Sequence, residues 1–389
     1  MSDPEQKKRV LFIFTEDWAF AALFLDRAVA ASAAGFEVAV HVRCTTHREI
    51  IEREGLRVIP HNISRSGTNP FSALWSIWKL AKVFRDFKPN IVHLIAIKPI
   101  VLGSLASFLY RDTKIINAPV GMGYLFASND LRARILRPAV RTMLGTLLGR
   151  REATTIIENS DDLGSLVEGG FLNRDQIVLI RGTGVNLEVF KASPEPKGNK
   201  VVVLVARMLV DKGVFEFVES AKEIRKTHLD TEFWLVGDVD LGNPGSLTSQ
   251  QLQDWATTGA IKWFGYRNDV AEILKQCHIV CLPSYREGFG KVFVEAGATQ
   301  RAVVATNVPG CREAVEDGRN GLLVQPKNVQ ALTAALIRLL EDDQLRLKMA
   351  AEGRKRAENE FSSATINKQT IAVYQRVLES SSLYGNSIN

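Results

Sequence analysis

Two glutamates eight positions apart, Glu287 and Glu295, lie in the segment PSYREGFGKVFVEAGA. Glu287 closes a predicted turn, and Gly288-Phe289-Gly290 allows close approach of the backbone. Glu295 lies about two turns into the helix that follows. The amides near Phe289, Gly290 and Lys291 at the helix start favour an anion or sugar hydroxyls. This separation predicts two different jobs for the carboxylates rather than a dyad. The alternative is an ordinary helix start with a solvated glutamate.

Two cations, Arg207 and Lys212, lie in VVVLVARMLVDKGV, where a buried apolar run ends and Lys212-Gly213 opens a helix. Cations at a strand end beside a helix N-terminus form a cradle for a diphosphate. The alternative is that Arg207 pairs with a carboxylate and Lys212 is solvated.

Metal-ligand patterns are absent from the sequence: there is no HExxH, and the six histidines are scattered. Asp238-Val239-Asp240 is a literal DxD after an apolar run, and we interpret it as a loop that accompanies Gly237 and Gly242. A metal-binding role for this pair is the alternative. The four cysteines show no CxxC spacing, which favours core packing as thiols. We therefore expect no metal or other cofactor.

Short apolar runs alternate with amphipathic stretches, and this alternation predicts an α/β chain with parallel sheets covered on both faces. Helical patterns occupy, for instance, 19–34 and 72–87. The predicted strands are 10–14, 37–42, 56–60, 90–94, 114–118, 154–157, 176–180, 200–206, 232–236, 261–264, 279–282, 303–306 and 321–324.

The alternation restarts at VVVLVAR, after the breaker-rich stretch 181–199. We therefore predict two Rossmann-like domains, residues 1–183 and 184–364, with a C-terminal helix at about 365–383 packing back on the first. Ligands of such sheets bind beyond the carboxyl ends of the strands, which places the expected site in the cleft between the domains. The alternative is a surface loop inside one large domain.

The ordered set of strand-Arg-Lys-Gly, GYRNDV, PSYREGFGK and VPGCREAVEDGRNGLLV resembles the family 4 retaining glycosyltransferases of the GT-B fold. The family's paired glutamates match Glu287 and Glu295, and its phosphate-binding cations match Arg207 and Lys212. The resemblance covers nearly the whole chain and is strongest over 201–326.

By that resemblance, Glu295 holds ribose hydroxyls and Glu287 lies beside the transferred sugar. Arg207 and Lys212 neutralise the leaving diphosphate, so that no metal is required. The remaining donor contacts are the backbone at Phe289, Gly290, Lys291 and Val292, and the base-bordering Tyr266 and Arg267.

The N-terminal half is similar to the branch of that family that extends oligosaccharides on bacterial polyprenyl-diphosphate lipids. The matching segments are FTEDWAF, HLIAIKPIVLGS and APVGMGYLF. The resemblance implies that His93, at the end of a predicted strand, faces the cleft near the reacting sugar. A structural histidine is the alternative. The residues expected on the acceptor side are Asp17, Lys98, Gly121 and Gly123.

The net charge of +6 favours an anionic partner. Leu131–Arg151 carries six arginines and no acidic residue, which suits an anionic membrane surface. Trp75, Trp78, Lys79 and Lys82 lie on a neighbouring predicted helix as a further anchor. The alternative is a solvated basic face that covers the sheet. No apolar stretch is long enough to span a bilayer, so we expect a cytoplasmic protein, peripheral on the inner face of the membrane.

These observations predict transfer of a sugar from a nucleoside diphosphate, UDP favoured, with retention, to a lipid-linked acceptor in bacterial polysaccharide or glycan assembly. Two rivals are a nucleotide-sugar epimerase and a phosphorylase of the same fold. A catalytically silent partner subunit is a third, although the retained Arg207, Lys212, Glu287 and Glu295 argue against it. Nucleic acid is suggested only by the pI near 9.1, and no reader motif supports it.

Overall fold

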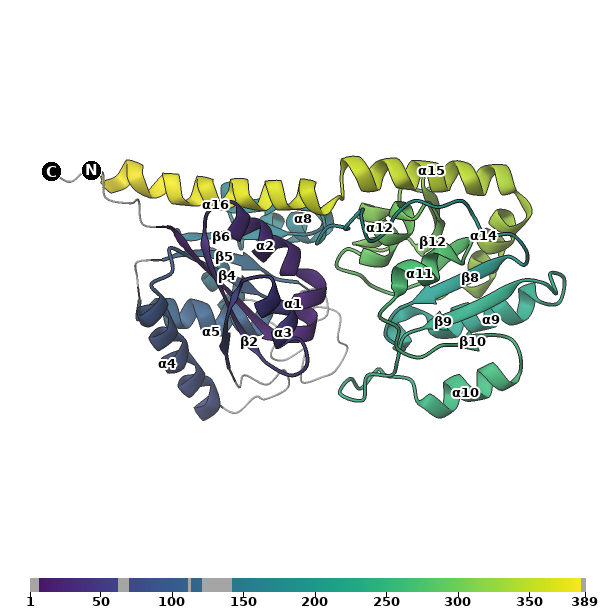
Figure 1. Cartoon of the computed structure of the whole chain (residues 1–389), viewed down its shortest axis with the longest axis horizontal. Coiled ribbons are helices and arrows are strands. Elements are labelled where there is room, and N and C mark those ends of the chain that lie inside the picture. The colour runs from purple at the N-terminus through teal and green to yellow at the C-terminus, as the bar shows by residue number, and fades with distance from the viewer. Residues whose placement is uncertain (1–6, 62–69, 111–112, 121–141, 386–389) are drawn as a thin grey trace. The chain divides into compact units, whose positions relative to one another are not determined.

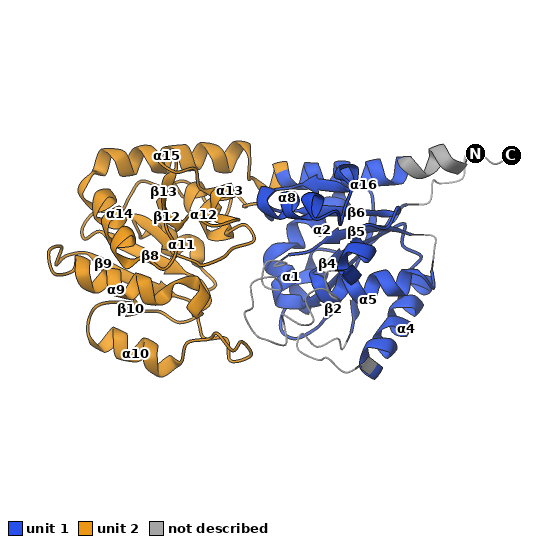
Figure 2. Cartoon of the chain, turned by 180° about the vertical axis from the view of Figure 1, so that it is seen from behind, with its two compact units in different colours: residues 1–183, 366–389 blue, residues 184–365 orange. Residues whose placement is uncertain are grey.

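The computed structural model describes residues 7–61, 70–110, 113–120 and 142–385. The chain divides into two compact units (Figures 1 and 2). Unit 1 is Met1–Thr183 with Ile366–Asn389, and unit 2 is Gly184–Thr365.

Unit 1 is built on seven parallel strands in the order β3-β2-β1-β4-β5-β6-β7. The strands are β1 (Arg9–Glu16), β2 (Glu37–Arg43), β3 (Arg57–Pro60), β4 (Ile91–Ile95), β5 (Lys114–Ala118), β6 (Ala153–Ile157) and β7 (Ile177–Leu179). The helices are α1 (Asp17–Leu23), α2 (Leu25–Ala33), α3 (Arg48–Arg53), α4 (Pro70–Phe87), α5 (Ile97–Ser107), α8 (Ser160–Glu168) and α16 (Ser363–Gly385).

Successive residues of β1 pack in two different cores, one on each face of the sheet, because side chains alternate across a strand. Phe12 packs with residues of α1, α2 and α16 on one face of the sheet. Leu11 and Ile13 pack with α4 and α5 on the other face. The C-terminal helix α16 runs along unit 1 (Figure 1) and buries Tyr374 and Val377 in the first of these cores. Unit 1 is therefore completed by the last helix of the chain.

The single helix predicted over 19–34 is wrong, because the helix breaks at Phe24. Phe24 has φ −127° and ψ −4°, between α1 and α2. Its ring lies 5.9 Å from that of Phe14 and beneath the guanidinium of Arg27. The break lets a large side chain enter the core, and the apolar periodicity alone does not reveal it.

Unit 2 has six parallel strands in the order β10-β9-β8-β11-β12-β13. The strands are β8 (Val201–Val205), β9 (Glu232–Val236), β10 (Lys262–Trp263), β11 (Ile279–Leu282), β12 (Ala302–Thr306) and β13 (Gly321–Val324). The helices are α9 (Val214–Ile224), α10 (Ser249–Thr257), α11 (Val270–Lys275), α12 (Lys291–Ala298), α13 (Cys311–Ala314), α14 (Val329–Glu341) and α15 (Asp343–Asn359).

In both sheets the second and third strands are added on one side of the first strand, and the fourth strand is added on its other side. This change of side places β4 beside β1 in unit 1 and β11 beside β8 in unit 2. Loops that leave such a pair of strands diverge to opposite faces and open a crevice at their carboxyl ends. In unit 2 the loops after β8 and β11 carry the charged residues singled out in the sequence.

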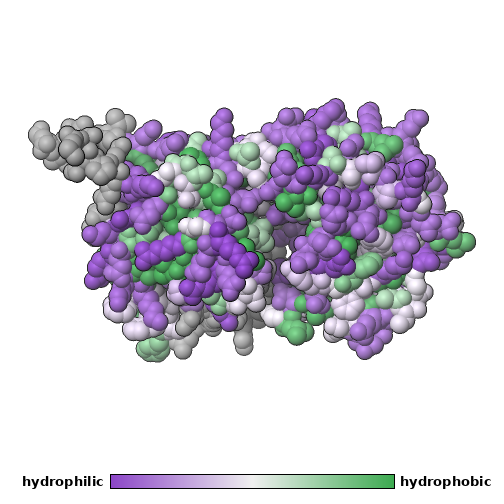
Figure 3. Space-filling model, viewed as in Figure 1, coloured by the Kyte–Doolittle hydropathy of each residue, from purple (hydrophilic) through white to green (hydrophobic). Residues whose placement is uncertain are grey.

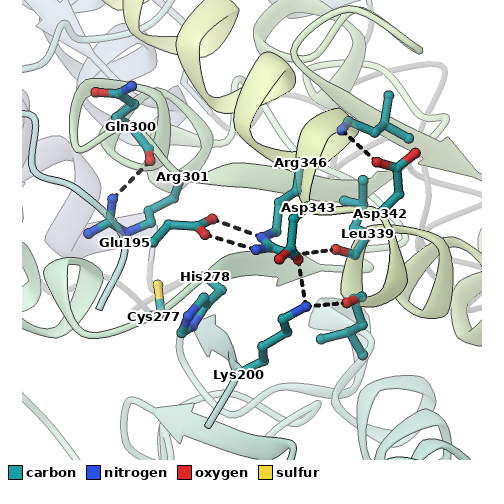
Figure 4. A network of polar contacts seen from close by, with 12 residues as sticks. Glu195, Lys200, Cys277, His278, Gln300, Arg301, Leu339, Asp342, Asp343 and Arg346 are labelled. Carbon is teal, nitrogen blue, oxygen red and sulfur yellow. Dashed lines mark hydrogen bonds and ion pairs between the residues drawn. The ribbon is translucent and has the colours of Figure 1, made fainter. Parts of the chain in front are cut away.

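The segment that enters unit 2 is clamped to it by two buried arginines (Figure 4). Arg301 Nη1 donates to the carbonyl of Ser193 at 2.7 Å. Arg346 forms a two-pronged contact with Glu195 at 2.8 and 2.9 Å, which Figure 4 shows. The amide of Val201 donates to Nδ1 of His278 at 3.1 Å. The irregular approach to β8 is thereby fixed by side chains of unit 2.

Candidate functional site

An ion pair between Lys212 and Glu287 lies at the crevice of unit 2. Lys212 ends the short 3₁₀ helix η2 (Val210–Lys212) in the loop after β8, and Glu287 lies in the loop after β11. Lys212 Nζ is 2.6 Å from Glu287 Oε1, and Ser284 Oγ donates to the same oxygen at 2.7 Å. The side chains are only 17% and 11% exposed. An anion that enters this crevice competes with Glu287 for Lys212.

Gly213 explains how Lys212 reaches Glu287. Its φ is +71°, and a Cβ at this position would lie 2.1 Å from the carbonyl oxygen of Pro283. Only glycine combines this backbone conformation with so close a contact. The backbone after β8 therefore rests directly on the backbone after β11.

A second close approach holds Glu287 from the other side. Gly310 has φ +80°, and a Cβ there would lie 2.4 Å from the carbonyl oxygen of Glu287. The next residue, Cys311, is buried, and burial with the nearby Glu287 carboxylate raises the pKa of its thiol to about 12. The Cys311 thiol is therefore unreactive and serves only in packing beneath Glu287. The turn at Gly310, just before it, fixes the position of the Glu287 backbone.

Arg207 pairs with Asp240, a residue whose role we did not predict. Arg207 Nη1 lies 2.5 Å from Asp240 Oδ2, with the side chains 42% and 22% exposed. Ser246 Oγ accepts from the amide of Asp240 at 2.9 Å and holds the loop after β9 in place. The alternative in which Arg207 pairs with a carboxylate is thus observed, whereas a solvated Lys212 is not. The literal DxD was the only sequence signal of this contact.

Glu295 lies in α12 with its carboxylate 3.6 Å from Lys291 Nζ and 12% exposed. Burial raises its pKa, although Lys291 opposes that change. Gly290, with φ +72°, caps the start of α12. The side chains of Phe289 and Val292 are buried in the core, so these residues present backbone rather than side chain to the crevice.

Tyr266 and Arg267 follow β10 on the surface of unit 2. Tyr266 is 70% exposed, and Arg267 Nε donates to Asp269 at 2.7 Å. The amide of Gly237 donates to the carbonyl of Gly265 at 2.8 Å, which ties this loop to the end of β9. An exposed aromatic ring near this strand end provides a flat apolar surface.

Tyr285 is a further polar residue beside Glu287 that the sequence did not single out. Its hydroxyl donates to Glu216 at 2.7 Å, and Lys327 Nζ lies 4.7 Å from the centre of its ring. Burial and the adjacent Glu216 carboxylate raise the pKa of Tyr285. Its ring therefore stays neutral and positions the turn that leads to Glu287.

The expectation that His93 ends a strand and faces a cleft is wrong. β4 continues to Ile95, and His93 lies in mid-strand with no exposed area. Its Nδ1 is 2.7 Å from the hydroxyl of Tyr374 in α16. Burial lowers the pKa of His93 to about 3, and the buried Arg27 adds to this effect. His93 is a neutral core residue of unit 1 in this structure.

The carboxylate of Asp17 accepts hydrogen bonds from the loop that follows β2. It is fully buried and accepts from the amides of Thr45, Thr46 and His47 at 2.7, 3.0 and 2.8 Å, and from the Thr45 hydroxyl at 2.5 Å. Burial opposes ionisation, but these hydrogen bonds lower its pKa overall. Asp17 therefore holds the loop after β2, and this position does not fit the predicted contact with an acceptor.

Lys98 is the second residue of α5, where burial lowers its pKa. The preceding Ala96 has φ +72° and ψ 162°, a strained conformation for a residue with a Cβ. Gly121 and Gly123 lie outside the described residues, so their predicted place on the acceptor side stays a prediction.

The described part of the arginine-rich stretch, residues 142–151, packs against unit 1. Leu144, Leu147 and Leu148 are buried. Arg150 lies over the ring of Phe108 at 4.1 Å and donates to Ser107 Oγ at 2.7 Å. Its charge is therefore held within the unit. Residues 131–141 lie outside the described part of the chain.

Within residues 7–61, 70–110, 113–120 and 142–385, no group of three or more His, Cys, Asp or Glu side chains is placed to hold a metal ion. No helix in the same ranges has the length and apolar character that a bilayer-spanning segment needs.

Two family models match the two halves of the chain. Residues 9–160 match "Glycosyl transferase 4-like", and residues 186–356 match "Glycosyl transferases group 1". The second match contains the Lys212–Glu287 and Arg207–Asp240 pairs.

Curated relatives align over most of the chain. An N,N'-diacetylbacillosaminyl-diphospho-undecaprenol alpha-1,3-N-acetylgalactosaminyltransferase from Campylobacter jejuni is 28% identical, with 88% of this chain and 92% of the relative covered. A UDP-Gal:alpha-D-GlcNAc-diphosphoundecaprenol alpha-1,3-galactosyltransferase from Escherichia coli is 25% identical, with 74% and 75% covered.

Solved structures share the fold. HepE from Anabaena, in complex with UDP and glucose, superposes with a TM-score of 0.76 at 20% identity, covering 94% of this chain and 99% of that one. A glycosyltransferase from Rickettsia africae gives 0.76 at 20% identity over 96% and 99%. The prediction of two Rossmann-like halves of the GT-B fold is thereby confirmed.

Proposed function

We propose that this chain, which belongs to the group 1 glycosyltransferases and carries a glycosyltransferase 4-like N-terminal half, moves a sugar from a nucleoside diphosphate to a lipid-linked sugar acceptor. The transfer retains the configuration at the anomeric carbon and serves bacterial surface polysaccharide or glycan assembly. The acceptor lies at an anionic membrane surface.

One observation carries the proposal: the crevice of unit 2 holds two cations whose carboxylate partners a diphosphate can replace. Lys212 is paired with Glu287, and Arg207 with Asp240. Both cations lie in the loop after β8, at the switch point where α/β sheets bind phosphorylated ligands. A diphosphate brings more negative charge than either carboxylate and is held by charge-assisted hydrogen bonds.

The same cations serve the chemistry. Negative charge grows on the diphosphate as the bond to the sugar breaks, and preorganised positive charge lowers the barrier to that step. Lys212 and Arg207 supply this charge, and we expect activity to persist when divalent metals are chelated. Glu287, once Lys212 turns to the diphosphate, lies beside the transferred sugar. Glu295 holds the ribose, and the flat Tyr266 ring with Arg267 borders the base.

UDP is the favoured nucleotide and a polyprenyl diphosphate the favoured lipid. Support comes from the printed names of relatives, because the E. coli protein uses UDP-Gal and both bacterial relatives act on diphosphoundecaprenol-linked sugars. HepE was crystallised with UDP.

The test is thermal unfolding with UDP, GDP, ADP and their sugars, run beside an Arg207→Ala/Lys212→Ala double variant. One nucleotide should raise the Tm of the wild type and not that of the variant. A folded wild type that responds to none of them would contradict the proposal and favour a silent partner subunit. A nucleotide sugar converted fully without any acceptor would favour an epimerase.

A further inference from the structure

Helix α4 of unit 1 exposes a second apolar face in addition to the one it packs on the sheet. Its exposed large side chains recur at the spacing of one helix face. They are Phe71 at 82%, Leu74 at 66%, Trp75 at 56% and Trp78 at 52% exposed. We call this set, with Lys79 and Lys82, the α4 outer face. Apolar atoms show at the lower tip of unit 1 in Figure 3, where α4 lies in the same view of Figure 1.

The α4 outer face is distinct from the face by which α4 packs on the core of unit 1. The opposite side of the helix is already packed, because Leu80, Phe84 and Phe87 are buried between α4 and the sheet. A helix of 100° per residue places these residues about half a turn away from Trp75 and Trp78. The outer face therefore has a function other than holding unit 1 together.

Charge and ring geometry on the outer face suit an anionic lipid surface. The rings of Trp75 and Trp78 stack with their centres 5.0 Å apart, and Lys79 Nζ lies 5.2 Å from the Trp75 ring. Lys82 continues the same face, and Asp86 is the first acidic residue of α4. Tryptophan beside lysine is the pattern of the bilayer interface, where rings lie at headgroup depth and ammonium groups meet lipid phosphates.

A solvated helix of the same protein looks different. The outward side of α9 in unit 2, with the turn that follows it, carries Glu219–Lys222 and Glu223–Lys226 ion pairs at 2.6 and 2.7 Å. Each charge there is balanced by a neighbour three residues away. On the α4 outer face, by contrast, residues 71–82 include no carboxylate, and the first acidic residue, Asp86, lies one turn beyond Lys82 near the end of the helix.

We propose that the α4 outer face binds the surface of an anionic bilayer, with its tryptophans at the headgroup level and its lysines against lipid phosphates. The inference rests on the proposed function, because a lipid-linked acceptor has to be met at a membrane. It assigns the contact to α4, whereas the sequence had placed it mainly on the arginine-rich stretch.

The test is flotation of the full chain with vesicles of phosphatidylcholine alone or with 30% phosphatidylglycerol (roughly the charge density of an anionic leaflet). The wild type should float with the anionic vesicles. Trp75→Ser/Trp78→Ser should bind at least about tenfold more weakly, since apolar insertion and charge act together. Lys79→Gln/Lys82→Gln should lose the preference for anionic lipid. Leu229→Ser, at a 74% exposed leucine of unit 2, is the matched control and should float like the wild type.

Wild-type protein that stays with the unbound fraction, or equal flotation of the tryptophan variant, would overturn the proposal. A wild-type dimer that the tryptophan variant converts to monomer, without flotation, would assign the face to a second copy of the chain and also overturn it. Thermal shift by the nucleotide separates the two proposals. It should be unchanged in all α4 variants, and its absence from the wild type would instead contradict the proposed sugar transfer.

Discussion

The candidate site residues of units 1 and 2 lie in opposite environments, although both units are parallel sheets with the same winding. In unit 2 the charges of the candidate site lie in loops at the carboxyl ends of strands, in ion pairs that keep some exposed area, such as Lys212–Glu287 and Arg207–Asp240. In unit 1 they are enclosed and neutral, as with His93 against Tyr374, or fully satisfied, as with Asp17. Charges that exchange partners can receive a ligand, whereas enclosed ones hold a fold. The candidate site residues of unit 2 are therefore placed to exchange partners, whereas His93 and Asp17 of unit 1 stabilise the fold.

The largest expected effect is on turnover at the most enclosed pair. Glu287→Gln should lower kcat by about 10²–10³-fold, the typical cost of one preorganised electrostatic contact. Glutamine keeps the acceptor for Ser284 but removes the charge beside the sugar. Initial rates at saturating donor measure it, with Glu272→Gln, a surface partner of Lys275, as control. Full turnover in Glu287→Gln would remove this residue from the mechanism.

Next in size is donor affinity. Lys212→Ala should weaken binding of the nucleoside diphosphate about 10- to 100-fold, because a charge-assisted hydrogen bond contributes about 1.5–3 kcal/mol. Arg207→Ala should cost less, since its side chain is 42% exposed. Calorimetric titration gives both numbers, and Lys222→Ala on α9 should bind like the wild type. If Arg207→Ala weakened nucleotide binding as much as Lys212→Ala, or more, the size of the effect would not follow how deeply each cation is buried.

The enclosed histidines predict acid sensitivity of unit 1. Burial lowers the pKa of His93 and of His41 to about 3, and that of His61 to about 4. Each is more readily protonated when unfolded, so its stabilising contribution is complete above pH 6.5 and falls as the pH drops toward the folded pKa. At pH 5 the loss is about 2 kcal/mol per fully buried histidine.

Urea unfolding at pH 7 and pH 5 checks this expectation. His93→Gln should reduce the pH-dependent loss by about 2 kcal/mol. The same pH dependence in wild type and His93→Gln would show that His93 is not kept neutral by the fold.

The smallest effect is expected at the more exposed pair. Asp240→Asn removes the carboxylate that competes for Arg207, so the nucleotide should bind up to about fivefold more tightly, the range of an exposed ion pair. The titration used for Lys212→Ala measures it. Weaker binding would show that Asp240 positions Arg207 for the ligand rather than competing with it.

The fold was largely predictable because buried parallel strands are continuous apolar runs. The predictions for β5, β9, β11 and β13 match their bounds, and the others lie within one or two residues. The helix break at Phe24 was missed, because a core aromatic residue does not interrupt a helical apolar pattern.

The candidate site was predictable in its loops but not in its contacts. Arg207, Lys212 and Glu287 follow strands that end at one edge of the sheet, so sequence order alone brings them together. Asp240 could not be matched to Arg207, because its loop folds back through hydrogen bonds of Ser246 and Gly245. His93 was placed at a strand end although Leu94 and Ile95 continue the apolar run, and that continuation was the signal for a buried position.

Unit 1 is assembled from two separated parts of the sequence, and this has a consequence for biosynthesis. Unit 2 is one continuous stretch, whereas the unit 1 core needs Tyr374 and Val377 from the last helix. A chain that leaves the ribosome from its N-terminus therefore presents every strand of unit 1 before the helix that seals them. The second unit in sequence can finish folding first, and the first unit is completed only once α16 has been made.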